Sequence, residues 1–473
     1  MKEFLKPTRQ ILSLFLMSLW ILSCTQSAKD TSAKQPKLAT QSPNIVLIVA
    51  DDLGYPYAGF MGDTIVKTPH LDRLAEMGTV FTQGMVTESH CAPSLRTLIT
   101  GLHAEEFDLQ QAIFKEENRA SQTANLSSED SLIWEREYEW KSMSFFQTLP
   151  KYLREKNYTS FQGGKWWEYN YQNGGFTEGM STGWSNEDRG KKDFFYKLMG
   201  NEGLKLGRVT NQPVYDFVDK QKDNPFFVWY APDLPHYPLN AAERYYNIYA
   251  NEDLTESAKR YYANITWFDD NIGELMSYFE KKGLMENTLF IYVNDNGWDQ
   301  EPNAEYRHDS LRWHNGGPKG KGSYYDLTFR TPIIFTWKGT LPSAQVKNEL
   351  ISSMDVLPTI LDYVAIQKPD HLRGRSYRPN IEQGSAEGRE MIFGKITQLF
   401  DPNDKTFMGK AAEGYWVRTP KYHYVWDLTN KKELLFDMED DPKNDQNIAA
   451  ENSELTVYYQ QEIEKWKQEI GIE

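Results

Sequence analysis

Two pairs of polar side chains in this sequence could together hold a metal ion. Asp51 and Asp52 follow one continuous apolar run, and Asp295 and Asn296 follow another. Adjacent buried carboxylates are costly unless a cation or hydrogen-bond donors compensate them, and oxygen ligands of this kind suit a hard divalent cation such as calcium or magnesium. Asp and Asn are also common turn residues. The two pairs are therefore either one cation site or two ordinary turns.

Cys91 is the second residue that could do chemistry. It lies in the stretch SHCAPSLRTLITG at positions 89–101, and the chain's other cysteine, Cys24, ends an apolar segment near the N-terminus. Cys91 therefore has no partner for a structural disulfide. The apolar positions 95–99 predict a helix with Cys91 near its start, where backbone donors stabilise developing negative charge. The alternative is an inert thiol that packs as a small apolar side chain.

Alternating strands and helices must position these groups. Apolar, β-branched runs predict buried strands, and apolar residues at helical spacing from Trp267 to Phe279 predict a helix that Gly283 ends. This alternation indicates an α/β fold with a largely parallel sheet, in which sites form at the carboxyl ends of strands. The predicted strands are residues 44–50, 158–162, 225–230, 288–293 and 330–335. The other predicted helices are residues 68–75, 145–156 and 350–364.

Two further segments differ from this pattern. Residues 104–143 are rich in Glu, Gln, Asn and Ser, and we interpret them either as an insertion over the sheet or as a solvated excursion. After about residue 367 the strand candidates become closely spaced, at 415–417, 422–426 and 433–437, and an amphipathic helix follows. This pattern predicts a small C-terminal subdomain with an antiparallel sheet.

The order and spacing of these motifs resemble those of the sulfatase family, over nearly the whole chain beyond residue 42. The resemblance implies an alkaline-phosphatase-like sandwich around a central, mostly parallel sheet, with a catalytic domain at 43–366 and a C-terminal subdomain at 367–473. The motifs that carry it are Asp51-Asp52-Leu53-Gly54, Thr68-Pro69-His70-Leu71-Asp72, Cys91 to Gly101, Gly164-Lys165-Trp166, Pro235-His236-Tyr237-Pro238, Asn294-Asp295-Asn296-Gly297, Lys321-Gly322-Ser323, Asp355-Val356-Leu357-Pro358 and Asp440-Asp441-Pro442.

The resemblance also implies a role for each candidate residue. A formylglycine-generating enzyme would oxidise Cys91 to formylglycine, whose hydrate attacks the sulfur of a sulfate ester. Lys165 and Lys321 would bind the sulfate, and His236 would protonate the leaving alcohol. One calcium ion would be held by Asp51, Asp52, Cys91, Asp295 and Asn296. Without the resemblance, each lysine reads as a solvated surface charge and His236 as a hydrogen-bonded core histidine.

Two positions depart from the family pattern. The family has Arg four residues after the cysteine, whereas here Leu95 stands there and Arg96 follows, a rotation of about 100° on a helix. The family usually has His two residues after the motif lysine, whereas here Trp167 stands there and can only donate one hydrogen bond. The histidines that could replace it in space are His90, His103, His308 and His314. His314 closely precedes Lys321 and is favoured among them, unless it is a loop residue without a role.

The N-terminus and the charge limit the partners. Lys2 and Lys6 precede an apolar run at 11–22 that is too short for a membrane span, so residues 1–24 are interpreted as a secretory signal. Cys24 resembles a lipoprotein cleavage site, with a plain cleaved signal as the alternative, and the polar residues 25–42 read as a tether. We expect an exported protein of the bacterial periplasm or cell surface, attached to a membrane only through a lipid on Cys24. A formal net charge of −15 excludes an unspecific nucleic-acid binder.

The sequence therefore predicts a calcium-dependent sulfatase that acts on a sulfated carbohydrate, such as algal ulvan. One alternative is a phosphate or phosphonate ester hydrolase on the same scaffold, because sulfate and phosphate share tetrahedral geometry. The other is a sulfatase-like glycan-binding protein that has lost the modification, as Leu95 and Trp167 suggest.

Overall fold

The computed structural model describes residues 42–222, 224–299, 319–383, 387–399 and 410–472. The predicted signal, nearly all of the predicted tether, His308 and His314 lie outside this part of the chain. Within it, no helix combines the length and the apolar composition that a membrane span needs.

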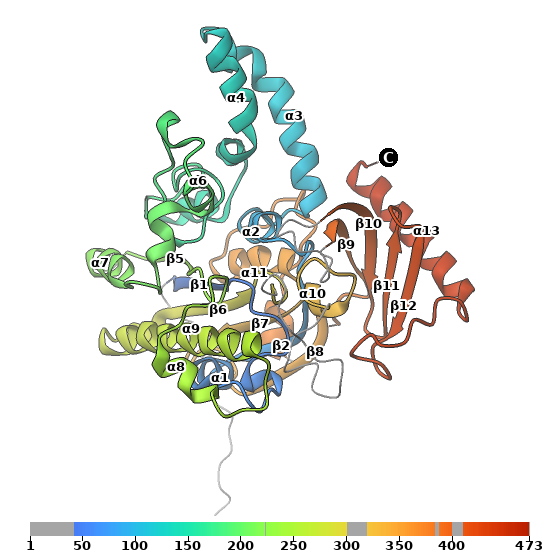
Figure 1. The fold of residues 1–473 in the computed structure, drawn as a ribbon. Helices are drawn as coiled ribbons and strands as arrows, with labels where there is room; N and C mark the ends of the chain where they lie inside the picture. The colour runs from blue at the N-terminus through green and yellow to red at the C-terminus, as the bar shows by residue number, and fades with distance from the viewer. Residues whose placement is uncertain (1–41, 223, 300–318, 384–386, 400–409, 473) are drawn as a thin grey trace, which may run out of the picture. The chain divides into compact units, whose positions relative to one another are not determined.

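An eight-stranded sheet forms the centre of the larger part of the fold (Figure 1). All neighbouring strands run parallel except β7, which is antiparallel to both β6 and β2. This arrangement confirms the predicted α/β fold with a mostly parallel sheet. In spatial order the strands are β4 (Glu178–Gly179), β3 (Thr159–Gly164), β5 (Phe226–Ala231), β1 (Asn44–Ala50), β6 (Thr288–Asn294), β7 (Arg330–Thr336), β2 (Thr79–Met85) and β8 (Gln345–Ser352).

The central strand β1 is buried on both faces, which explains its uninterrupted apolar sequence. Its side chains alternate between two apolar clusters, with Leu47 in one and Ile48 in the other. Helices α2 (Cys91–Thr100), α5 (Leu149–Leu153) and α11 (Val356–Tyr363) contribute to the first cluster. Helices α1 (Pro69–Glu76), α7 (Gln212–Lys220), α8 (Glu243–Tyr249) and α9 (Glu256–Lys281) contribute to the second. The sheet is thus covered by helices on both faces, as parallel sheets usually are.

The pairing of β1 with β6 sets the geometry of the candidate site. The two strands are parallel and in register, so that Ala50 lies opposite Asn294. The residues that follow, Asp51 and Asp295, therefore leave the sheet side by side.

A second sheet, of four antiparallel strands, forms the C-terminal part of the fold (Figure 1). It confirms the predicted antiparallel C-terminal sheet, whereas the exact domain boundaries stay a prediction. Helix α13 (Ser453–Ile470) packs on one face through Ile463 and Trp466. In spatial order the strands are β12 (Lys432–Asp437), β11 (Tyr422–Asp427), β10 (Lys410–Arg418) and β9 (Ile392–Leu399).

The structure differs from the predicted elements in two places, and it defines the elements of a third segment that the sequence left open. Residues 350–352 end strand β8 and pair with β2, so the helix predicted from residue 350 begins only at Val356. The helix predicted at 145–156 is one short helix, α5, between two 3₁₀ turns. Residues 104–143 form helices α3 (Ala104–Thr123) and α4 (Ser128–Lys141), which extend away from the sheet (Figure 1). The remaining helices are α6 (Phe194–Met199), α10 (Asp326–Phe329) and α12 (Arg378–Gln383).

We expect acid to destabilise the fold in part through His423. Burial lowers the pKa of this residue from 6.5 to about 4, and its Nε2 lies 2.8 Å from the Tyr324 carbonyl oxygen. The unfolded chain takes up this proton near pH 6.5, whereas the folded protein takes it up only near pH 4. The contribution of neutral His423 to the free energy of unfolding is therefore complete above pH 6.5. It falls by about 3 kcal/mol as the pH drops to 4.

Urea unfolding of His423→Gln between pH 7 and pH 4 should show a shallower loss of free energy of unfolding than the wild type. His371→Gln, the same change at an exposed position, should follow the wild-type slope. Identical slopes for all three proteins would show that His423 does not carry the effect.

Candidate active site

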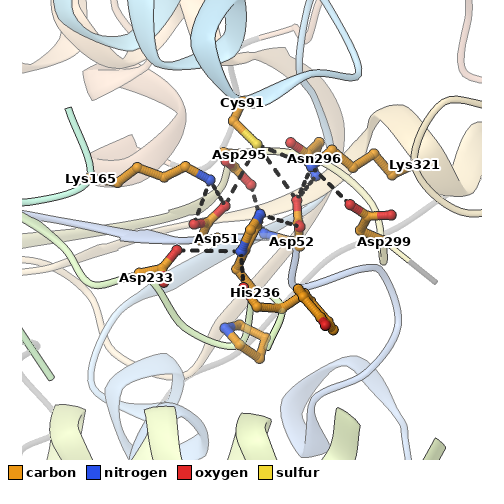
Figure 2. Close-up of polar contacts among 12 residues, drawn as sticks. Asp51, Asp52, Cys91, Lys165, Asp233, His236, Asp295, Asn296, Asp299 and Lys321 are labelled. Carbon is orange, nitrogen blue, oxygen red and sulfur yellow. Dashed lines mark hydrogen bonds and ion pairs between the residues drawn. The ribbon is translucent and has the colours of Figure 1, made fainter. Parts of the chain in front are cut away.

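The ends of β1 and β6 bring together four of the five predicted metal ligands, Asp51, Asp52, Asp295 and Asn296, as Figure 2 shows. The Asp295 amide donates to the Ala50 carbonyl at 3.0 Å, and the Asp52 amide donates to Asp295 Oδ1 at 2.9 Å. Asp52 has φ +62°, in the left-handed region that non-glycine residues seldom adopt. The Tyr261 hydroxyl fixes this turn by donating to the Asp52 carbonyl at 2.7 Å. A turn of this kind directs the carboxylates of Asp51 and Asp52 to the same edge of the sheet.

Several oxygens of these side chains are buried without a hydrogen bond. Among the described residues, nothing donates to Asp52 Oδ2, Asp295 Oδ2 or Asn296 Oδ1. Unpaired buried carboxylate oxygens are costly, and the carboxylates of Asp51, Asp52 and Asp295 offer atoms within 4.8 Å of one another and of Cys91 Sγ. Convergent, unpaired, hard oxygens are the donor set that a divalent cation takes. These residues therefore fit a metal ion.

Cys91 is the first residue of helix α2 and faces this acidic cluster. The Ser94 hydroxyl donates to the Asp295 carbonyl at 2.6 Å and so ties the first turn of the helix to the end of β6. Cys91 Sγ lies 3.7 Å from both Asp51 Oδ1 and Asp52 Oδ1, and the residue is only 6% exposed. Burial raises the pKa of the thiol well above its ordinary value, although Lys165 and Lys321 oppose the shift. As a thiol, Cys91 is therefore protonated and a poor nucleophile.

Two buried lysines supply the positive charge of the site. Lys165 Nζ donates to both carboxylate oxygens of Asp51 at 2.6 Å, and Lys321 Nζ lies 2.8 Å from Asp52 Oδ1 and 3.1 Å from Cys91 Sγ. Lys165 directly follows Gly164, where a Cβ atom would come within 1.8 Å of the Ala231 carbonyl oxygen. Only glycine at position 164 allows the end of β3 to lie this close to β5, and this close approach places Lys165 in the site.

The pKa values of two of these carboxyl groups, Asp51 and Asp295, are shifted in opposite directions. Burial alone would raise the pKa of Asp51, but Lys165, His236 and Lys321 together hold it below its ordinary value. For Asp295, burial and the neighbouring Asp51 and Asp52 raise the pKa well above the ordinary value, although Lys165 and Lys321 oppose the shift. Ionising all three groups together would therefore require an additional positive charge, which a metal ion would provide.

His236 completes the set of predicted site residues, and two acids that the sequence did not single out lie around it. His236 Nε2 is 3.6 Å from Asp52 Oδ2, and Nδ1 is 3.4 Å from Asp233 Oδ1. Asp299 lies 3.5 Å from the Lys321 ammonium. Burial raises the pKa of Asp233 to about 6, although the charge of His236 opposes the shift. The sequence signal was weak: Asp233 stands three residues before His236 in a loop, which is also ordinary turn composition.

The departure at Arg96 has a structural explanation. Arg96 Nε donates to Glu168 Oε1 at 2.7 Å, and its guanidinium lies 5.0 Å from the centre of the Phe107 ring. Leu95, at the position where the family has arginine, is buried in the apolar core. Within the described part of the chain, Arg96 makes its hydrogen bonds and ion pairs with Glu168 and Glu139. Arg96 is therefore a structural ion-pair residue.

The departure at Trp167 leaves the site without a histidine at that position. The Lys165 ammonium lies 5.8 Å from the centre of the Trp167 ring, and the indole Nε1 is buried without an acceptor among the described residues. His90 directly precedes Cys91, with its Nδ1 2.8 Å from Glu88 Oε1. His103 is instead buried at the start of α3 beside the Phe393 carbonyl. Of the candidate replacements that the structure describes, only His90 lies next to the nucleophile position.

Removing the arginine of the buried Arg96–Glu168 pair should destabilise the protein. Arg96→Met leaves the Glu168 carboxylate buried and unpaired, and we expect a loss of about 3–5 kcal/mol in the free energy of unfolding. The double variant Arg96→Met/Glu168→Leu should recover most of that loss, because it removes the stranded charge. Chemical denaturation of the wild type, both single variants and the double variant measures this cycle. A double variant as unstable as Arg96→Met would contradict the interpretation.

Comparison with known proteins gives a consistent picture. A family model described as Sulfatase matches residues 43–366, and one described as N-sulphoglucosamine sulphohydrolase, C-terminal, matches residues 319–469. The N-acetylgalactosamine-6-sulfatase of Rattus norvegicus is 25% identical, over 75% of this chain and 68% of its own. The ulvan-active sulfatase of Formosa agariphila is 24% identical, over 92% and 82%. The crystal structure of Ps i-CgsB, 23% identical, aligns with a TM-score of 0.68 over 90% of this chain and 93% of that one.

Proposed function

Because the chain belongs to the sulfatase family of sulfuric ester hydrolases, we propose that it hydrolyses sulfate esters of a carbohydrate, using formylglycine formed from Cys91 and one calcium ion. The observation that carries this proposal is the placement of Cys91 Sγ between the acidic cluster and Lys321. Relatives that are named for acting on N-acetylgalactosamine 6-sulfate and on ulvan support a carbohydrate ester. In the cell, a formylglycine-generating enzyme would convert Cys91, and the exported product would meet its substrate in the periplasm or at the cell surface.

Two groups that this chain can hold would supply the reactivity. Formylglycine at position 91, once hydrated, would supply a hydroxyl nucleophile, and the oxygens of Asp51, Asp52, Asp295 and Asn296 would hold a calcium ion that would supply positive charge to the sulfate. Conversion also replaces the sulfur of Cys91 with oxygen, which is the harder ligand and the one that calcium prefers.

The chain's own residues do the remaining work. The ammonium of Lys321 is 3.1 Å from Cys91 Sγ and so is placed to bind a sulfate oxygen at the reacting sulfur. Lys165 adds a second buried positive charge beside Asp51. His236 donates the proton of its Nε2 to the ester oxygen of the alcohol as the sulfur–oxygen bond breaks. Without that proton an alkoxide would have to leave, and alkoxides are poor leaving groups.

The test is to assay protein from a host that contains a formylglycine-generating enzyme. We expect sulfate release from 4-nitrophenyl sulfate and from at least one of N-acetylgalactosamine 6-sulfate, ulvan oligosaccharides and carrageenan oligosaccharides, with much slower phosphate release from 4-nitrophenyl phosphate. Mass spectrometry of the tryptic peptide 74–96 should show the lighter aldehyde at position 91. Faster phosphate than sulfate release would instead favour the phosphate or phosphonate ester hydrolase.

A second candidate, a glycan-binding protein without turnover, is favoured by one observation. Leu95 stands at the signature position and offers the modifying enzyme no charge, and in the folded site Arg96 pairs with Glu168. A peptide that carries only the alkylatable thiol, while a control sulfatase in the same cells is converted, would exclude formylglycine catalysis. Retained binding of ulvan or carrageenan oligosaccharides would then identify the second candidate.

A further inference from the structure

We propose that Asp233 is a positioning residue that holds His236 in the orientation and tautomer needed for proton donation, and that Arg208 fixes Asp233 in turn. This inference rests on the proposed sulfatase function. It concerns the loop after strand β5, residues 232–240, which carries both Asp233 and His236.

Side chains from outside the loop hold its backbone on two sides. Arg208 Nε donates to the Asp233 carbonyl at 2.7 Å, and Arg208 Nη2 donates to the His236 carbonyl at 2.7 Å. From helix α9, Asn264 Nδ2 donates to the Pro235 and Pro238 carbonyls, both at 3.3 Å. The Asp51 amide also donates to the Leu234 carbonyl at 3.0 Å, which joins the loop to the acidic cluster. The loop thus presents His236 from a fixed backbone.

The carboxylate of Asp233 adds a constraint on the imidazole ring itself. The side chain is buried, and its Oδ2 lies 3.1 Å from Arg208 Nε. Its Oδ1 lies 3.4 Å from His236 Nδ1 (Figure 2). His236 Nδ1 also lies beside the Tyr237 carbonyl oxygen. Both neighbours of Nδ1 are hydrogen-bond acceptors, so Nδ1 carries a proton and donates it. The opposite nitrogen, Nε2, faces the acidic cluster at 3.6 Å from Asp52 Oδ2.

This arrangement explains why a buried acid stands at position 233. The guanidinium of Arg208 donates to four neutral acceptors on the loop, namely the carbonyls of Asp233, His236 and Pro238 and the amide oxygen of Asn240. The carboxylate of Asp233 is the one negatively charged group among these contacts. One of its oxygens faces Arg208 and the other faces His236. An acid that turns a histidine through Nδ1, so that Nε2 meets the reacting group, is a general device of acid–base catalysis.

The decisive variant is Asp233→Asn, which conserves the shape of the side chain. Its amide oxygen is expected to stay with Arg208, which turns the NH₂ group toward His236 Nδ1. Two donors would then face each other unless Nδ1 gives up its proton or the ring turns, and either change misplaces Nε2. We expect kcat on N-acetylgalactosamine 6-sulfate, or on whichever carbohydrate sulfate the wild type cleaves, to fall about 10- to 100-fold with little change in KM.

Substrates with different leaving groups distinguish a positioning role of Asp233 from a general structural role. 4-Nitrophenolate leaves without protonation, so kcat of Asp233→Asn on 4-nitrophenyl sulfate should fall less than about threefold. His236→Ala should show the same selective loss, and the double variant Asp233→Asn/His236→Ala should be no slower than His236→Ala alone. The matched control is Asn240→Ala, which removes another partner of Arg208 at 2.8 Å without touching His236. Its ratio of the two rates should equal that of the wild type.

Each contrary outcome has a distinct meaning. Equal losses on both esters, no loss on either, or additive effects in the double variant would overturn the role of Asp233 while leaving the proposed function intact. Thermal melting of every variant shows whether the folded fraction accounts for a loss. A wild type with converted Cys91 that cleaves no ester of the panel would overturn the proposed function, and this inference with it.

Discussion

Replacing Cys91 by alanine is expected to lower kcat by about 10⁴-fold or more, because alanine lacks the thiol that would be oxidised to give the proposed formylglycine nucleophile. The fold should survive, since the Cys91 side chain is small and its contacts are 3.7 Å approaches to Asp51 and Asp52 and one contact with Lys321. Sulfate release from 4-nitrophenyl sulfate measures the loss, and the melting temperature shows that the variant is folded.

Ser89→Ala is the matched control for this variant. Ser89 is a buried neighbour in the same segment, and its side chain contacts Glu88 and His90. We expect the control to retain activity within a few-fold of the wild type. If Cys91→Ala kept substantial turnover, a nucleophile other than residue 91 would have to be sought.

Replacing Asp295 by asparagine should separate metal binding from folding. The change keeps the shape of the side chain but removes the carboxylate whose pKa is raised by burial and by Asp51 and Asp52. In chelator, the variant should therefore be at least as stable as the wild type. With calcium, the wild type should gain about 2.7 kcal/mol at a free concentration 100 times the Kd, whereas Asp295→Asn should gain little and should lose activity by about 100-fold or more.

Thermal melting in chelator and in graded calcium measures both effects. The control is Asp355→Asn, the same change at a buried carboxylate that pairs with Arg389. This variant should be less stable than the wild type but should show the same calcium-dependent shift. An undiminished calcium response in Asp295→Asn would contradict the assignment of this residue as a ligand.

The sequence predicted best those elements whose type follows from a single hydrophobicity pattern. Strand β1 is buried on both faces, so its apolar run could only be a central strand, and the acids after it had to lie at a sheet edge. The pairing of Ala50 with Asn294 could not be read from the sequence. It joins positions that are more than 200 residues apart, and a β-branched run does not specify its neighbour.

The elements that were missed depend on long-range contacts of the same kind. Residues 350–352 are apolar enough for a helix or a strand, and pairing with β2 decides for the strand. Asp233 resembled a turn residue because its partners, Arg208 and His236, meet it only in the folded loop. By contrast, the sequence correctly identified Leu95 and Arg96 as a departure, since one residue of shift on a helix turns the side chain to another face.

The burial of Cys91 also bears on when the proposed conversion of this residue to formylglycine would take place. In the folded chain the residue is 6% exposed, at the first position of a helix packed against the sheet, so a second enzyme could not enclose it without unfolding that segment. The proposed conversion to formylglycine would therefore have to take place on the newly made chain, before α2 docks. We expect that protein folded in a host without the modifying enzyme cannot be activated later by adding that enzyme. The fraction of active molecules should then depend on the rate of Cys91 oxidation relative to the rate of folding.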